Sequence, residues 1–369
     1  MTRTCAHILL LAAALLLPGC GKIMPEPSDR PLVFKAAVAG TKSLVMNKSM
    51  GVAYDEQEVM KVFALYHAAP FDECDLDGPD KKVVEFMDPN GEVCSYDGTL
   101  EAWKASGNYY WPKAGYLTFQ AYSPAEATLD NFAHSWSSGF SFGFTVPAAG
   151  QQYDLMYTDL VKDRERTQYD SNDPYDDIIG DRGAYKGVDL PFQHALSLIE
   201  VQAVNGLGSG SPTQFYIQKI QLVNVFNHGS FSNAAWVENY DTVSKSDYSA
   251  LDLSGATAPD DWKKLPGGEE AASSIHPATV LMLMPQLLDR DGDASLNITT
   301  DAYLHIEYKK ISGAQTLADV AIQTGDYPLG TVWEKGKKYI YRLVFSDFIE
   351  FEASIQRWDD EIIGSYTIN

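Results

Sequence analysis

The sequence has few basic residues for its length. Its 369 residues include 28 Lys and Arg against 50 Asp and Glu, which gives a formal net charge of -22 at pH 7. Proteins that bind nucleic acids neutralise phosphates with clustered Lys and Arg side chains, so this balance argues against a nucleic-acid partner. The same charge is typical of a soluble body that stays off an anionic membrane surface.

Patterns for metal binding and catalysis are also missing. The seven histidines are scattered, and none lies in a His-x-His or His-Glu-x-x-His motif. We interpret His194 as a packed or hydrogen-bonded side chain. Gly139-Phe140-Ser141-Phe142-Gly143 matches a hydrolase motif, but that motif needs a strand-to-helix turn, and the chain continues here as a strand. We therefore predict no enzymatic activity, no cofactor and no catalytic metal.

Long apolar runs are absent. The run from Ile8 to Leu17 is about half of the ~20 residues that a spanning helix needs. It follows Arg3 and precedes small residues, which is the layout of a secretory signal peptide. Its ending, Leu17-Pro18-Gly19-Cys20, resembles the lipobox of bacterial lipoproteins. The resemblance implies removal of residues 1–19 and acylation of Cys20 with a lipid such as palmitate. The alternative is an ordinary signal peptide with a chance cysteine.

Cysteine is scarce, with four in the whole chain. Beyond Cys20 the exported protein retains Cys74 and Cys94. In an oxidising compartment such a pair forms a disulfide by default. The bridge would close a loop of about 20 residues and contribute roughly 3 kcal/mol to stability. We predict this disulfide, with two free thiols as the alternative.

Helical periodicity is missing as well. Short runs instead alternate apolar and polar residues, and turn-forming residues such as Asp88-Pro89-Asn90-Gly91 separate them. Runs of this kind at regular spacing are typical of β-sandwiches, so we predict an all-β fold. The runs are residues 32–38, 59–66, 116–122, 141–146, 215–225, 280–284, 303–308 and 339–345.

The length predicts two domains. Without residues 1–19 the chain keeps about 350 residues, more than one hydrophobic core usually holds. Residues 20–31 are rich in proline and predict a tether. The acidic stretch from Lys162 to Lys186 is interpreted as a solvated loop. We therefore expect an N-terminal domain over residues 32–186 and a C-terminal domain over residues 187–369.

Two short motifs leave alternatives open. Asp289-x-Asp291-Gly292-Asp293 resembles the front of a calcium loop but lacks the distal Glu, and a hairpin turn explains the same residues. Asp241-Thr242-Val243 resembles an acceptor of periplasmic O-glycosylation in the Bacteroidetes, on three residues only.

Several segments in order resemble the fimbrillin family, the lipoprotein precursors of Bacteroidales pili. They are Tyr109-Tyr110-Trp111-Pro112, Leu117 to Pro124, Asp154 to Tyr157, Val188 to Ser197, Ile220 to Asn224, Leu283 to Gln286 and Trp333 to Tyr341. The resemblance implies two transthyretin-like β-sandwich domains in tandem, a place in a surface fimbria anchored at the outer membrane, and a role in adhesion. The implied partners are other pilus subunits, outer-membrane lipid through Cys20, and host or bacterial surface ligands.

The resemblance also implies assembly by β-strand exchange, in which a protease removes the first strand and another subunit's strand fills the groove. The first strand is Leu32, Phe34, Ala36 and Val38, which share one parity. Lys42-Ser43 matches the family's processing position, where major pilins carry Arg, so Arg-specific cleavage is in doubt. Ile349 to Gln356 alternates as a final half-buried strand. The tail with Ile362, Tyr366 and Ile368 is a possible donor strand or an ordinary last strand.

A second hypothesis for the function is that the chain is a surface glycan-binding lipoprotein of a polysaccharide-uptake system. Such proteins also place β-sandwiches behind a lipid and stack exposed aromatic rings on sugars. The tryptophans available for that role are Trp103, Trp136, Trp236 and Trp262.

Overall fold

The computed structural model describes residues 24–38, 59–76, 83–100, 102–169, 187–207, 210–237, 244–256, 262–265, 273–274, 280–293, 295–358 and 362–368. Cys20, Lys42, Ser43 and Thr242 lie outside these residues. The described chain consists of strands with short 3-10 turns, so the predicted all-β fold is confirmed. Within these ranges, no helix is long and apolar enough to cross a membrane.

Each predicted alternating run overlaps a strand, and further strands lie outside the runs. In the first half they are β1 (Pro27–Pro31), β2 (Val33–Val38), β3 (Met60–His67), β4 (Val83–Glu85), β5 (Glu92–Asp97), β6 (Ala102–Ala105), β7 (Tyr110–Pro112), β8 (Tyr116–Ser123), β9 (Asp130–Ser135), β10 (Gly139–Thr145), β11 (Met156–Thr158), β12 (Val161–Arg164) and β13 (Val188–His194). In the second half they are β14 (Ser197–Asn205), β15 (Thr213–Phe226), β16 (His228–Ser232), β17 (Ala235–Trp236), β18 (Lys245–Asp252), β19 (Lys263–Lys264), β20 (Ser273–Ser274), β21 (Leu281–Leu283), β22 (Gln286–Leu287), β23 (Tyr303–Ser312), β24 (Gln323–Pro328), β25 (Val332–Trp333), β26 (Lys337–Phe345), β27 (Ile349–Arg357) and β28 (Ile362–Ile368).

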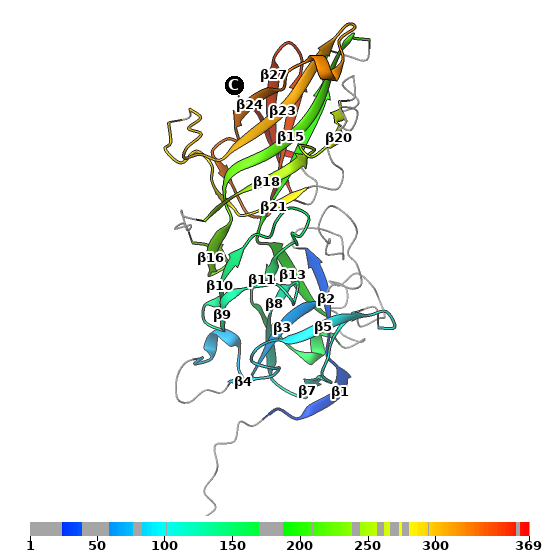
Figure 1. The fold of residues 1–369 in the computed structure, drawn as a ribbon. Helices are drawn as coiled ribbons and strands as arrows, with labels where there is room; N and C mark the ends of the chain where they lie inside the picture. Colours follow the sequence, from blue (N-terminus) through cyan, green and yellow to red (C-terminus); the bar gives the residue numbers. More distant parts are fainter. Residues whose placement is uncertain are drawn as a thin grey trace, which may run out of the picture.

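The first half, in the lower part of Figure 1, is built on one nine-stranded sheet. Its order is β12-β8-β11-β13-β2-β6-β5-β3-β4, and a further pairing of β8 with β3 closes the path of strands on itself. Closure removes free edges from the strands inside the ring, so β2 has a hydrogen-bonded neighbour on each side. Alternate residues of these strands, among them Phe34, Phe119 and Phe192, fill a core that Trp111 of β7 joins.

The second half, in the upper part of Figure 1, holds two larger sheets and the short pair β22–β25. One contains β14, β26, β27 and β28 in that order, and the other contains β18, β15, β23 and β24. The sheets pack face to face, as the 5.3 Å between the rings of Phe215 on β15 and Phe345 on β26 shows. This is the sandwich arrangement that the alternating runs predict.

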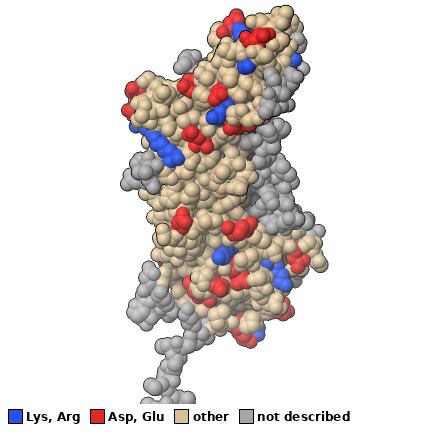
Figure 2. Space-filling view, in the orientation of Figure 1, with Lys and Arg blue, Asp and Glu red and all other residues tan. Residues whose placement is uncertain are grey.

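A four-stranded sheet ties the two halves together. Its order is β17-β16-β10-β9, and Phe142 of β10 lies opposite Phe231 of β16 with stacked rings 4.9 Å apart. Trp236 adds a 2.6 Å hydrogen bond from its indole N–H to the carbonyl of Ala195. Figure 2 shows that charged side chains gather over the two halves of this face, with mainly uncharged side chains between them.

The change from one half to the other falls later than the acidic stretch predicted. Residues 188–194, expected in the C-terminal domain, form β13, which pairs with β2 and β11 of the first sheet. The next strand, β14, pairs with β26 of the second half. The predicted boundary near residue 186 therefore precedes a strand of the first half, because the apolar run after it completes that half's sheet.

Candidate assembly site

Strand β2 lies in the middle of the closed sheet, between β13 and β6. It runs parallel to β13 over five residue pairs, from Val188 opposite Phe34 to Phe192 opposite Val38. It runs antiparallel to β6 over two pairs, Val33 with Lys104 and Phe34 with Trp103. Without β2 these two neighbours would each lose a ladder, and the ring would open into a groove.

The side chains of β2 and of the residue before it are the reason why the strand is held. Leu32, Phe34 and Ala36 are 2%, 0% and 0% exposed, as their shared parity predicted. The Phe34 ring meets the edge of Phe119 at a centroid distance of 5.4 Å. Burial of each large apolar side chain contributes roughly 1.5–3 kcal/mol. The backbone of Val38 belongs to β2, but its side chain lies outside the described ones.

Gly187 lets β13 begin directly against β2. Its φ is +97°, and a Cβ placed there would lie 2.6 Å from the carbonyl oxygen of Val33 and 2.7 Å from the amide nitrogen of Phe34. Only glycine tolerates both the left-handed backbone and that approach. Sequence reasoning missed this residue, although its position just before the apolar run at Val188 was the available signal.

The segment before β2 is held more lightly. Strand β1 pairs with β7 in a separate two-stranded sheet, and Lys113 forms an exposed ion pair with Glu26 at 2.6 Å. An exposed pair of this kind contributes about 0–1 kcal/mol. The residues after β2, which contain the predicted cleavage position, and the predicted lipid-bearing Cys20 lie beyond the described chain.

The tail forms β28, the last strand of its sheet. It pairs antiparallel with β27 from Phe351 opposite Ile368 to Gln356 opposite Ile362, with an irregularity between Ile355 and Gln356. Among the described strands β27 is its single neighbour, whereas β27 also pairs with β26 over nine residue pairs. The expectation of a final half-buried strand at residues 349–356 is confirmed by the burial of Phe351 and Ala353.

A ring stack joins the two regions. His194, at the end of β13, stacks on Trp358, just after β27, with centroids 4.1 Å apart and planes 3° apart. The same histidine is hydrogen-bonded through Nδ1 to Asp154 at 2.7 Å, and both side chains are buried. The interpretation of His194 as a packed, hydrogen-bonded side chain is therefore confirmed.

The predicted disulfide is not formed, since Cys74 and Cys94 are both free. Cys94 lies opposite Met60 at the start of β3, whereas Cys74 follows the other end of β3 at His67. The eight residues of β3 rise about 3.3 Å each, which separates the thiols by far more than the ~7 Å between Cα atoms that a bridge allows. Burial raises the pKa of both thiols.

The aspartate turn forms a different group from the one its motif suggested. Carboxylate oxygens of Asp289, Asp291 and Asp301 lie within 4.8 Å of one another, and Asp293 is not part of the group. Backbone N–H groups already bond these oxygens, from Arg290 and Asn297 to Asp301 and from Gly292 to Asp289. Hydrogen bonds inside the turn therefore account for its acidic residues.

The remaining candidate residues lie in structural positions. Ser141 is an exposed residue of strand β10, opposite Ser232 of β16, as expected for a strand rather than a nucleophile turn. Of the four tryptophans weighed for sugar stacking, Trp103, Trp136 and Trp262 are buried, and Trp236 is half-buried against Phe231. They serve the core instead.

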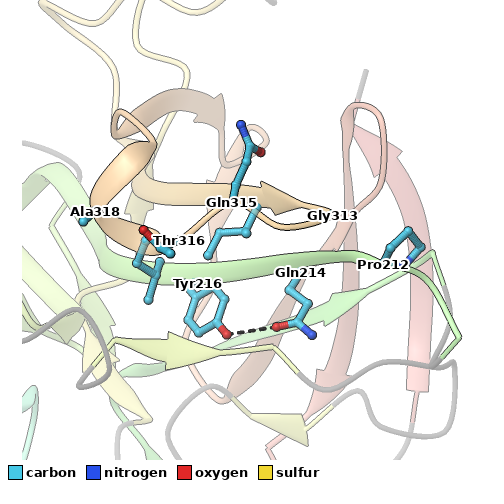
Figure 3. A pocket seen from close by; sticks show the side chains of 9 residues that line it. Pro212, Gln214, Tyr216, Gly313, Gln315, Thr316 and Ala318 are labelled. Carbon is cyan, nitrogen blue, oxygen red and sulfur yellow. Dashed lines mark hydrogen bonds between the residues drawn. The ribbon is translucent and has the colours of Figure 1, made fainter.

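A pocket of about 400 Å³ opens at the start of β15, beside the turn that follows β23. Figure 3 shows Gln214 and Tyr216 on β15, joined by a hydrogen bond of 2.9 Å, with Gln315 and Thr316 across from them. No lining residue carries a formal charge. The pocket's chemistry suits a neutral, polar ligand, and no sequence motif predicted it.

Comparison with known proteins supplies independent findings. A family model described as fimbrillin-like matches residues 87–358, a range that contains neither β2 nor β28. The comparison with curated protein sequences gives no match.

Three solved structures are similar. A fimbrial protein from Bacteroides vulgatus is 16% identical, with a TM-score of 0.56 over 89% of this chain and 100% of that one. A candidate cell adhesion protein from Bacteroides ovatus is 12% identical, with a TM-score of 0.48 over 92% and 100%. The tip fimbrial protein Mfa3 from Porphyromonas gingivalis, with a C-terminal truncation, is 11% identical, with a TM-score of 0.38 over 82% and 95%.

Proposed function

Because this chain belongs to the fimbrillin-like family, we propose that it is a subunit or anchor of a cell-surface fimbria, assembled by β-strand exchange after export as a lipoprotein. The family is one of fimbrial structural proteins and not of enzymes, in line with the prediction from the sequence. A role in adhesion and contacts with other pilus subunits are part of the proposal.

The observation that carries strand exchange is the position of β2. It is the first strand of the large sheet, it bridges β13 and β6, and it contributes buried apolar side chains to the core. Its removal would expose two unpaired strand edges and an apolar groove, which another chain's strand would cover by β-augmentation. While β2 is attached it occupies the groove as an intramolecular partner at high effective concentration, so the precursor is expected to be monomeric.

Lipidation at Cys20 and cleavage at Lys42-Ser43 complete the proposal. A second Lys-Ser pair, Lys48-Ser49, lies six residues further on, and a cut at either pair would release β2 from β3. The lipid would hold the precursor at the outer membrane until the cut frees the body.

The test uses a soluble precursor with Cys20→Ser, treated with a Lys-specific protease. Ladders of non-covalent oligomers on a gel without boiling are expected for the cut protein only. Lys42→Ala combined with Lys48→Ala should abolish them, and the two single variants show which of the two pairs is cut. N-terminal sequencing identifies the cut. Cut protein that remains monomeric would overturn strand exchange.

Binding of a surface glycan is a second candidate function, and the pocket at Tyr216 favours it. Its volume falls within the ~300–1,000 Å³ typical of small-ligand sites, and its amide and hydroxyl groups are the usual partners of sugar hydroxyls. Tyr216→Ala should then weaken binding to a panel of neutral oligosaccharides at least tenfold. Tyr110→Ala, which removes an exposed tyrosine on β7 of the first half, is the control. Equal oligosaccharide binding by the unchanged protein, the Tyr216→Ala variant and the Tyr110→Ala variant would refute glycan binding at this pocket.

A further inference from the structure

We propose that the tail of a second copy fills the β2 groove in the opposite chain direction to β2, with Ile368 at the place of Leu32 and Ile362 at the place of Val38. The inference rests on the proposed strand exchange and adds the direction and register of the incoming strand. Two independent observations carry it, the order of side-chain sizes and the pattern of backbone pairing.

The order of sizes matches in reverse. Every second residue from Leu32 to Val38 belongs to one face of β2 and the residue before it. These residues are in turn aliphatic, aromatic, small and aliphatic: Leu32, Phe34, Ala36 and Val38. The tail residues Ile368, Tyr366, Gly364 and Ile362 read the same way from the C-terminal end. An aromatic ring would then enter the place of Phe34 beside Phe119, and the smallest residue the place of Ala36.

A tail inserted in the same chain direction as β2 does not fit the sites that the β2 side chains leave. It would put Gly364 at the place of Phe34 and Tyr366 at the place of Ala36. The first change leaves a ring-sized void next to Phe119, whose ring lies 5.4 Å from that of Phe34. The second forces a phenol into a site where Ala36 is 0% exposed, and close-packed cores tolerate neither change.

Backbone pairing favours reversal as well. The five-pair ladder of β2 with β13 is parallel, and the two-pair ladder with β6 is antiparallel. A reversed strand makes the longer ladder antiparallel and only the shorter one parallel. Since parallel pairing is slightly less stable per residue, the incoming tail gains over β2 on the longer side. The tail also exchanges one neighbour, β27, for two.

The experiment uses one acceptor and two donors. The acceptor carries Lys104→Cys, lacks residues 362–369 and is cut to release β2. The donors are uncut precursors with either Thr367→Cys or Ile363→Cys. Native cysteines are replaced in all chains. Lys104 pairs with Val33, which is the place of Thr367 in the reversed strand and of Ile363 in the same-direction strand.

The reversed strand predicts a disulfide-linked dimer with the Thr367→Cys donor in at least tenfold excess over that with Ile363→Cys. A reversed preference, or equal cross-linking of both donors, overturns the inference while strand exchange stands. Absence of any acceptor–donor complex in size-exclusion chromatography overturns strand exchange itself. The outcomes are therefore distinguishable.

A composition-matched variant sharpens the result. The double change Gly364→Tyr with Tyr366→Gly keeps the tail's residues and exchanges their order, so that the tail now matches β2 in the same direction. The preferred cross-link should move from position 367 to position 363. A preference that stays at 367 would show that side-chain size does not set the direction, and would overturn the argument made from it.

Discussion

Strand β2, near the start of the described chain, and strand β28, at its end, differ in how they are held. Strand β2 has a ladder on each side and buried residues in the centre of a closed sheet. Strand β28 has a ladder on one side, at the edge of an open sheet. In a subunit that assembles by the proposed strand exchange, the donor strand β28 is expected to leave its own sheet at a small cost in free energy. Strand β2 is expected to leave only after the chain is cut.

The sharpest way to break this comparison is to damage each strand in turn. Phe34→Ala should lower the free energy of unfolding by about 3–5 kcal/mol, because it removes a fully buried ring from the core. Deletion of residues 362–369 should change it far less, because β27 keeps its nine-pair ladder to β26. Urea denaturation monitored by tryptophan fluorescence measures the change in unfolding free energy for both variants. Equal losses would contradict the comparison.

A smaller effect is expected at Gly187, where β13 meets β2. Gly187→Ala should destabilise the precursor by about 1–3 kcal/mol, because it combines a left-handed backbone with a clash against the backbone of Val33 and Phe34. Gly150→Ala is the matched control, with φ +84° and open space around the added Cβ. The difference between the two variants isolates the clash. A difference near zero would mean that β13 and β2 separate freely.

The core beside β3 should also respond to pH. Burial lowers the pKa of His134 to about 4, against about 6.5 in an unfolded chain. Between these values the unfolded chain binds a proton that the folded chain does not, so stability falls as pH falls through this window, by about 1–2 kcal/mol for a half-buried side chain. His134→Gln should flatten the dependence of unfolding free energy on pH between 6.5 and 4. If the slope of unfolding free energy against pH does not change in this variant, the pH dependence arises from groups other than His134.

The smallest effect concerns the cysteines. Reducing agent should leave the unfolding midpoint unchanged, because Cys74 and Cys94 are not bonded. A thiol reagent at pH 8 should modify Cys74 before Cys94, which is buried and whose pKa burial raises. Cys94 should react only as the first half unfolds. Mass spectrometry showing a 74–94 disulfide in the exported protein would contradict the structure.

Alternating patterns predicted the strands well because period-two burial is local. Phe34, Ala36, Phe351 and Ala353 are buried as their parity required. The cysteine pairing failed because sequence separation says nothing about which ends of a strand two residues flank. The position of β13 was missed for a related reason, since an apolar run does not reveal the sheet it joins. The pocket at Tyr216 arises from a turn packing beside a strand start, and no local pattern encodes that meeting.

The stack of His194 on Trp358 has a mechanical consequence for a filament assembled as proposed. β2 and β13 run side by side, so the groove of each subunit ends two residues before His194, and its own tail begins just beyond Trp358. Tension along a fibre would enter through the groove and leave through the tail, so it would pass between the two halves at this stack and at the β10–β16 pairing.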